Sequence, residues 1–196
     1  MIVIDVETTG TNPLKHSILS IGAVDSRYPS ERFSEECRMF NGAHVDPVAL
    51  TINGFSKEEI TLGTKQTEHE LISAFLSWLE LREEITPAGQ NPLFDLGFLE
   101  AASHRASQNY FLPHRSIDLH SVTYMHMIGR GITPPVLNKK TDLNSDKIME
   151  YVGIPFEPKP HKALNRALWE LEAFSRLLFN EPLLSEFKKF PLPWKV

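Results

Sequence analysis

Apolar residues cluster early in the chain in short runs that are typical of β-strands. Met1–Val6 is almost entirely apolar, and Thr8-Thr9-Gly10 follows it as a turn signal. Ser17–Val24 (SILSIGAV) forms a second apolar run, whereas Arg32–Phe40 is more polar. We therefore expect two buried strands followed by a third strand nearer the edge of a sheet.

Further along the chain, the pattern changes to helical spacing interrupted by short strands. Leu71, Ile72, Phe75, Trp78 and Leu79 recur on one face of a helix expected over Glu68–Leu81. Ser56 could cap a short helix. The other expected elements are strands at Ile85–Gly89 and Arg115–Leu119, helices at Phe94–Ala106, from 119 to about 130, Thr141–Tyr151 and Lys162–Phe179, and a loop at Ile132–Leu137. This order predicts an α/β fold, a mixed sheet flanked by helices.

Size and composition limit the choice further. A chain of 196 residues suits one domain, expected over residues 1–180, with residues 181–196 as a tail packed on it or extending from it. No uncharged apolar run is long enough for a membrane span. The start, MIVIDVE, lacks the features of a secretory signal, and the single Cys37 suits a reducing compartment, so we expect a cytoplasmic protein.

Charge is unevenly distributed along the chain. The net charge is −5, yet residues 104–166 carry nine Lys or Arg against five Asp or Glu. The excess could be chance in a surface, or it could form a mildly basic rim suited to a short phosphate backbone.

Asp5 and Glu7 are the first candidates for chemistry. Residues i and i+2 of a strand point to the same face, so both carboxylates should converge on one side of the first strand. Carboxylates in a buried strand are costly unless a cation or hydrogen-bond donors compensate them. The alternative is that the strand ends here and both acids are solvated.

Asp95 and His161 are the other two candidates. Asp95 begins a predicted helix, where an acid also simply favours the helix dipole. His161 follows Pro158-Lys159-Pro160 at the entrance to the last helix. It could be an ordinary loop residue or a general base, since imidazole exchanges protons near neutral pH.

Taken in order, the motifs DVETTG, NPLFD and HKALNRA resemble those of the DEDD 3′–5′ exonucleases of the DEDDh type. That family includes ribonuclease T and the proofreading subunit of bacterial replicative DNA polymerase. The stretch from Asp46 to Ile60 adds to the resemblance, which covers residues 1 to about 180.

The resemblance implies a ribonuclease-H-like fold and hydrolysis of terminal phosphodiesters at single-stranded DNA or RNA 3′ ends. It implies two divalent cations, Mg²⁺ or Mn²⁺, held by Asp5, Glu7 and Asp95, with His161 taking the proton of the attacking water. Thr8, Thr9 and Gly10 would line the terminal nucleotide. Hard cations of this kind prefer oxygen ligands and, in pairs, stabilise in-line displacement.

Arg166 departs from the family pattern, which has an aspartate at this position. Three arrangements are open: Arg166 turns outward and pairs with Glu170, Glu170 replaces the missing ligand, or the guanidinium occupies a metal position. Activity could therefore be reduced. The alternative function is an inactive nuclease-fold module that binds nucleic acid ends or a protein partner, and metal binding would separate the two.

Overall fold

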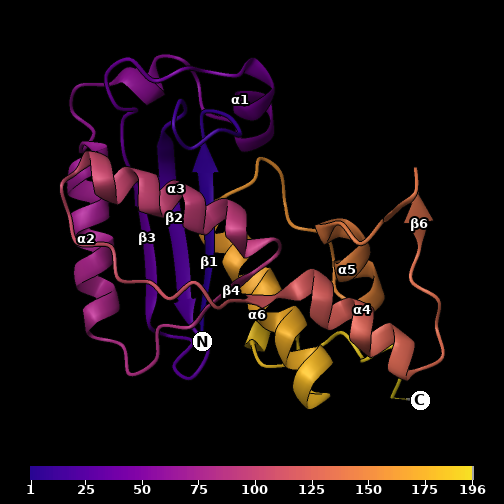
Figure 1. The fold of residues 1–196 in the computed structure, drawn as a ribbon. Coiled ribbons are helices and arrows are strands. Elements are labelled where there is room, and N and C mark those ends of the chain that lie inside the picture. The colour runs from indigo at the N-terminus through magenta and orange to yellow at the C-terminus, as the bar shows by residue number, and fades with distance from the viewer. Residues whose placement is uncertain (196) are drawn as a thin grey trace.

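The centre of the molecule is a five-stranded mixed sheet in the order β3-β2-β1-β4-β5 (Figure 1). The computed structural model describes residues 1–195. β1 pairs antiparallel with β2, and β2 with β3, whereas β4 and β5 continue the sheet in parallel. The strands are β1 (Ile2–Thr8), β2 (Ile18–Asp25), β3 (Arg32–Glu36), β4 (Pro87–Gly89) and β5 (Ile117–Asp118).

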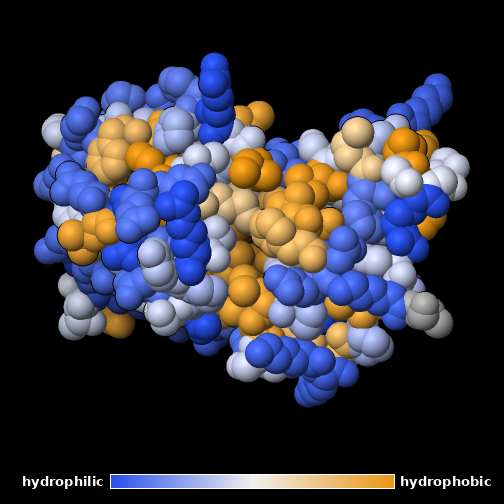
Figure 2. All heavy atoms as spheres, turned by 90° about the horizontal axis from the view of Figure 1, so that it is seen from below, coloured by the Kyte–Doolittle hydropathy of each residue, from blue (hydrophilic) through white to orange (hydrophobic). Residues whose placement is uncertain are grey.

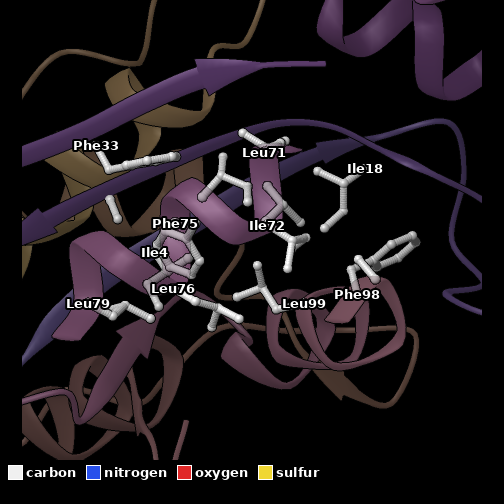
Figure 3. Packing of buried hydrophobic residues seen from close by; sticks show 14 of the residues in the cluster. Ile4, Ile18, Phe33, Leu71, Ile72, Phe75, Leu76, Leu79, Phe98 and Leu99 are labelled. Atoms are coloured by element: carbon white, nitrogen blue, oxygen red, sulfur yellow. The ribbon is translucent and has the colours of Figure 1, made fainter. Parts of the chain in front are cut away.

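Helices cover both faces of this sheet, as the sequence predicted. Two helices, α2 and α3, contribute to a hydrophobic cluster on one face, part of which is drawn in Figure 3. The other helices, α4, α5 and α6, contribute to a second cluster on the opposite face. Their bounds are α2 (Glu68–Glu80), α3 (Pro92–Arg105), α4 (Leu119–Gly129), α5 (Ser145–Val152) and α6 (Ala163–Phe179).

Several elements differ from the expectation. The helix expected near Ser56 is a single 3₁₀ turn, η1 (Glu59–Thr61), preceded by a true helix, α1 (Pro47–Asn53). The Asp46 side chain caps α1, and Gly54 ends it in a left-handed conformation.

The loop expected at Ile132–Leu137 ends in a small hairpin of β6 (Val136–Leu137) and β7 (Lys140–Thr141). Asn138 and Lys139, both with positive φ, make its two-residue turn, which sequence patterning missed. Asn144 caps α5, so that helix begins at Ser145 rather than Thr141. β1 extends to Thr8, and β3 stops at Glu36 instead of Phe40.

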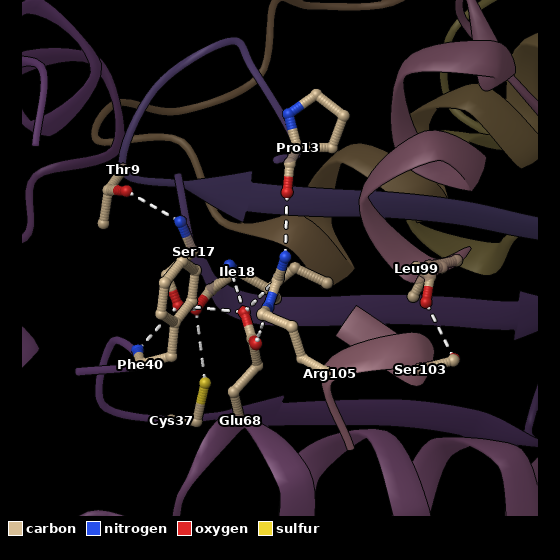
Figure 4. Close-up of polar contacts among 10 residues, drawn as sticks. All are labelled: Thr9, Pro13, Ser17, Ile18, Cys37, Phe40, Glu68, Leu99, Ser103 and Arg105. Carbon is tan, nitrogen blue, oxygen red and sulfur yellow. Dashed lines mark hydrogen bonds and ion pairs between the residues drawn. The ribbon is translucent and has the colours of Figure 1, made fainter. Parts of the chain in front are cut away.

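An ion pair between the buried Glu68 and the more exposed Arg105 joins α2 and α3 to the sheet (Figure 4). Glu68 accepts hydrogen bonds from the Ser17 hydroxyl and the Ile18 amide at 2.9 and 3.0 Å. Arg105 of α3 lies 2.8 Å from the same carboxylate. One glutamate therefore fastens α2 to both α3 and the start of β2.

A second ion pair, which is fully buried, fastens the segment after α6 to that helix. This segment includes η2 (Ser185–Phe187). Glu172 and Arg176 are fully buried and 2.7 Å apart. Glu172 accepts from the Leu183 and Leu184 amides, while Arg176 donates to carbonyls that include that of Phe187. The described part of the tail thus packs on the same body as the sheet.

The surface seen from below carries hydrophobic residues near its middle, surrounded by hydrophilic ones (Figure 2). Leu178 and Phe179, at the end of α6, are among the exposed apolar residues of the molecule. Within the described chain, no helix combines the length and apolar character needed to cross a bilayer.

Candidate active site

The side chains of β1 alternate between the two faces of the sheet, and this alternation puts Asp5 and Glu7 on the same face. Ile2, Ile4 and Val6 pack into the cluster with α2 and α3, whereas Val3 packs into the cluster with α6. Asp5 and Glu7 share the face of Val3 and are half-buried. The alternative in which the strand ends and both acids are solvated is therefore wrong.

Gly22 allows α6 to approach these acids. It lies opposite Asp5 in the β1–β2 register, and a Cβ there would lie 2.1 Å from the backbone of Ala163 and Leu164. The first turn of α6 therefore rests directly on β2. His161, just before this turn, lines a 350 Å³ pocket together with Glu7.

Asp95 reaches the same site from the first turn of α3. Its Oδ1 accepts a hydrogen bond from the Val6 amide at 2.9 Å, and the residue is 5% exposed. The helix start predicted around Asp95 is correct, but the carboxylate also joins the helix to β1, between Asp5 and Glu7 in the chain.

Glu170 is a fourth acid at this site, and it lies on α6. It is 2% exposed, and its Oε2 accepts a hydrogen bond from the Gln90 amide at 3.0 Å. The sequence offered it only as one of three alternatives at the break in the family pattern.

Burial is the main cause that raises the pKa values of these acids, and repulsion from neighbouring acids adds to it. Burial, then Asp95, Glu7 and Glu170, hold the pKa of Asp5 well above its usual range. Burial and then Glu170 likewise raise the pKa of Asp95. Burial raises the pKa of Glu7 to about 7, with Glu157 adding to the effect, and that of Glu170 to about 8. The four carboxylates thus lie close enough to share one electrostatic environment, in which acids outnumber the single guanidinium of Arg166.

His161 and Arg166 both contact Glu157, a buried residue that the sequence analysis missed. Glu157 Oε2 lies 2.7 Å from His161 Nδ1 and 2.8 Å from Arg166 Nε. The Lys162 amide donates to Glu157 Oε1 at 3.2 Å, and Arg166 Nη2 lies against His161 Nδ1. Only its position four residues before His161 could have indicated Glu157.

Arg166 therefore does not pair with Glu170, and that arrangement, the first of the three, is wrong. Its ion pair within the described chain is with Glu157. The guanidinium is still close enough to lower the pKa values of Asp5, Glu7 and Glu170. The side chain of Arg166 is only 16% exposed, so Arg166 is turned toward the acids and offsets part of their charge.

The turn after β1 is closely packed. Thr8 donates to the Gly10 carbonyl, and Thr9, fully buried, donates to the His44 carbonyl, both at 2.7 Å. A Cβ on Gly10 would meet the ring of His16 at 2.3 Å, so a larger residue there would displace that ring. Thr8 and Gly10 line a 200 Å³ pocket that also includes Glu7 and Phe94, whereas Thr9 does not reach it.

The donor chemistry of the site suits a hard divalent cation. Buried carboxylate oxygens in excess over positive charge are what Mg²⁺ and Mn²⁺ bind. In residues 1–195, no three His, Cys, Asp or Glu side chains converge as a complete ligand set. The acids thus match a divalent cation in charge and donor type but are not arranged as a complete ligand set. The assignment of each ligand stays a prediction.

Comparisons with known proteins point to nucleases. Residues 2–174 match the family model described as exonuclease. Ribonuclease T of Yersinia pseudotuberculosis is 28% identical over 195 residues, covering 90% of this chain and 83% of the relative. The chloroplastic/mitochondrial exonuclease DPD1 of Arabidopsis thaliana is 25% identical, covering 92% of this chain and 56% of the relative.

Solved structures share the fold. Escherichia coli exonuclease I, crystallised with a dA13 oligonucleotide, superposes with a TM-score of 0.72 at 18% identity, over 92% of this chain. The chain spans 40% of that enzyme's length. Cell-death related nuclease 4 gives a TM-score of 0.71 at 17% identity, covering 92% of this chain and 64% of that one. With the family model matched along most of its length and the ribonuclease-H-like sheet in place, the chain belongs to the exonuclease family.

Proposed function

We propose that the protein is a divalent-metal-dependent 3′–5′ exonuclease that shortens single-stranded DNA or RNA. The observation that carries the proposal is the group of buried and half-buried acids, Asp5, Glu7, Asp95 and Glu170, with His161 sharing a pocket with Glu7, within an exonuclease fold. Buried acids that repel one another lower stability, so their presence together favours a bound cation.

The metal ligands proposed from the family resemblance are Asp5, Glu7 and Asp95, for two Mg²⁺ or Mn²⁺ ions. Bound there, such ions would supply charge stabilisation for the phosphate and a more acidic water. Asp95 is held ready by the Val6 amide, and Asp5 and Glu7 by the pleat of β1. The strand and the helix end thus position these acids before any ligand arrives.

His161 is the proposed general base. If its Nδ1–H donates to Glu157 Oε2, the Nε2 lone pair is free to accept the proton of the attacking water. Donation from Arg166 to Nδ1 would instead leave the proton on Nε2. Glu157 therefore favours the reactive tautomer, and Arg166 holds the same Glu157 oxygen, Oε2, in place at 2.8 Å.

The proposed place for the terminal nucleotide is the 200 Å³ pocket beside Glu7, Thr8 and Phe94. The ring of Phe94 could stack on a base, and such contacts tolerate any sequence. The oligonucleotide-bound exonuclease I structures support single-stranded ends as the substrate class. Phe98, by contrast, is fully buried in the core.

The test is hydrolysis of 5′-labelled single-stranded DNA and RNA oligonucleotides with Mn²⁺. A ladder of products shortened stepwise from the 3′ end is expected, and Asp5→Ala should abolish it. EDTA provides the metal-free control. An oligonucleotide of the same sequence labelled at its 3′ end should release labelled mononucleotide from the first turnover.

Intact substrate under these conditions, with the oligonucleotide still bound, would overturn the proposed chemistry. The protein would then act as a nuclease-fold module that holds nucleic acid ends. Cleavage that begins at the 5′ end would refute the direction while leaving the nuclease activity in place.

A further inference from the structure

We infer that Glu170 supplies the metal-binding carboxylate that the family pattern places at position 166. The inference rests on the proposed function and adds a residue to it. Residues 166 and 170 lie one turn apart on the same side of α6, so side chains at both positions face the acids of β1 and α3.

The pairing of buried glutamates is the first argument. Four glutamates are buried, and three have an arginine at ion-pair distance: Glu68 with Arg105, Glu157 with Arg166, and Glu172 with Arg176. Glu170, at 2% exposure, has no ion pair among the described residues. A buried carboxylate without a direct ion-pair partner is one that a bound cation would stabilise.

The space around Glu170 is the second argument. Its Oε2 lies 3.3 Å from where a Cβ on Gly89 would stand, and the Ile4 carbonyl lies 3.0 Å from the same point. Glycine at the end of β4 thus leaves room for this carboxylate against the backbone of β1, next to Asp5. The Gln90 amide holds the same oxygen at 3.0 Å, which fixes its position.

The position of Arg166 is the third argument. Its guanidinium forms its ion pair with Glu157 at 2.8 Å, so among the described residues it acts on Glu170 only from beyond ion-pair distance. The chain therefore differs from the family pattern at two linked points: an arginine tied to Glu157, and an acid one turn later.

Mn²⁺ affinity, measured by isothermal titration calorimetry without nucleic acid, tests the inference. Glu170→Gln should weaken Mn²⁺ binding at least tenfold, and Glu170→Asp should retain part of the affinity. Glu150→Gln, which removes an exposed acid from α5, is the matched control and should bind as the original protein does. Circular dichroism in EDTA establishes that each variant is folded.

Recovery of Mn²⁺ affinity in the double variant Arg166→Asp/Glu170→Gln would show that the two positions are interchangeable for the ligand. Binding by Glu170→Gln as tight as that of the original protein would overturn the inference alone. Absence of Mn²⁺ binding by the original protein would instead overturn the metal-dependent function, and with it the inference.

Discussion

Replacing Glu170 by glutamine should make the metal-free protein more stable at alkaline pH. Burial is the main cause that raises the pKa of Glu170 from 4.5 to about 8 in the folded state. An acid with a raised pKa favours folding while it is protonated and opposes folding once it is ionised. Metal-free stability should therefore fall as the pH rises from about 4.5 to about 8.

The size of the effect follows from the shift. Each pKa unit corresponds to about 1.4 kcal/mol, so the shift of Glu170 sets an upper limit of about 5 kcal/mol. At 2% exposure, solvent screens little of this energy. Glutamine retains an oxygen that can accept from the Gln90 amide, so the charge is the principal loss. For a chain of this size, about 2–4 °C of melting temperature accompanies each kcal/mol.

Urea unfolding in EDTA at pH 5, 7 and 9, followed by circular dichroism, measures this directly. The stability gained by Glu170→Gln should be small at pH 5 and largest at pH 9, and Glu150→Gln should show no such trend. If Glu170→Gln were less stable than the original protein at pH 9, Glu170 would have a favourable partner, and the reasoning on unpaired buried charge would be wrong.

Two further variants test the contacts of the buried glutamates. Glu157→Gln should lower kcat about tenfold or more with Mn²⁺ affinity unchanged, because His161 loses the carboxylate that orients it. In a His161→Asn background the same change should lower kcat little further. An equal loss of kcat in that background would refute the coupling between Glu157 and His161. Glu172→Gln should destabilise the protein by about 3–5 kcal/mol in urea unfolding, because it leaves Arg176 buried without its counter-charge. A loss below about 1 kcal/mol would mean that the carbonyls around Arg176 are sufficient to stabilise its buried charge.

The fold and half of the site could be predicted from local patterns, for clear physical reasons. Alternation along β1 and an acid in the first turn of α3 are set by neighbours in sequence, so local patterns made Asp5, Glu7 and Asp95 candidates, and the family resemblance then predicted their role. Glu157 was missed because a loop residue gains its role only when the fold brings Arg166 to its carboxylate. The arrangement in which Arg166 pairs with Glu170, one of the three left open, was wrong for the same reason. Helical spacing allows that pair, but Arg166 forms its ion pair with Glu157, which the fold brings to it.

Restoring the family residue with Arg166→Asp should therefore not simply improve the protein. The change removes the partner of Glu157 and adds an acid near Asp5 and Glu7, whose pKa values Arg166 now lowers. Breaking a buried pair costs about 3–5 kcal/mol, so this variant should melt at a lower temperature than the original protein in EDTA. Mn²⁺ should then raise its melting temperature by more than it raises that of the original protein, because more carboxylates bind the ion in the folded state alone. Equal melting temperatures in EDTA would show that Arg166 does not offset the charge of the site. Its ion pair with Glu157 would then contribute nothing to stability, and the link between the arginine at position 166 and the acid at position 170 would be refuted.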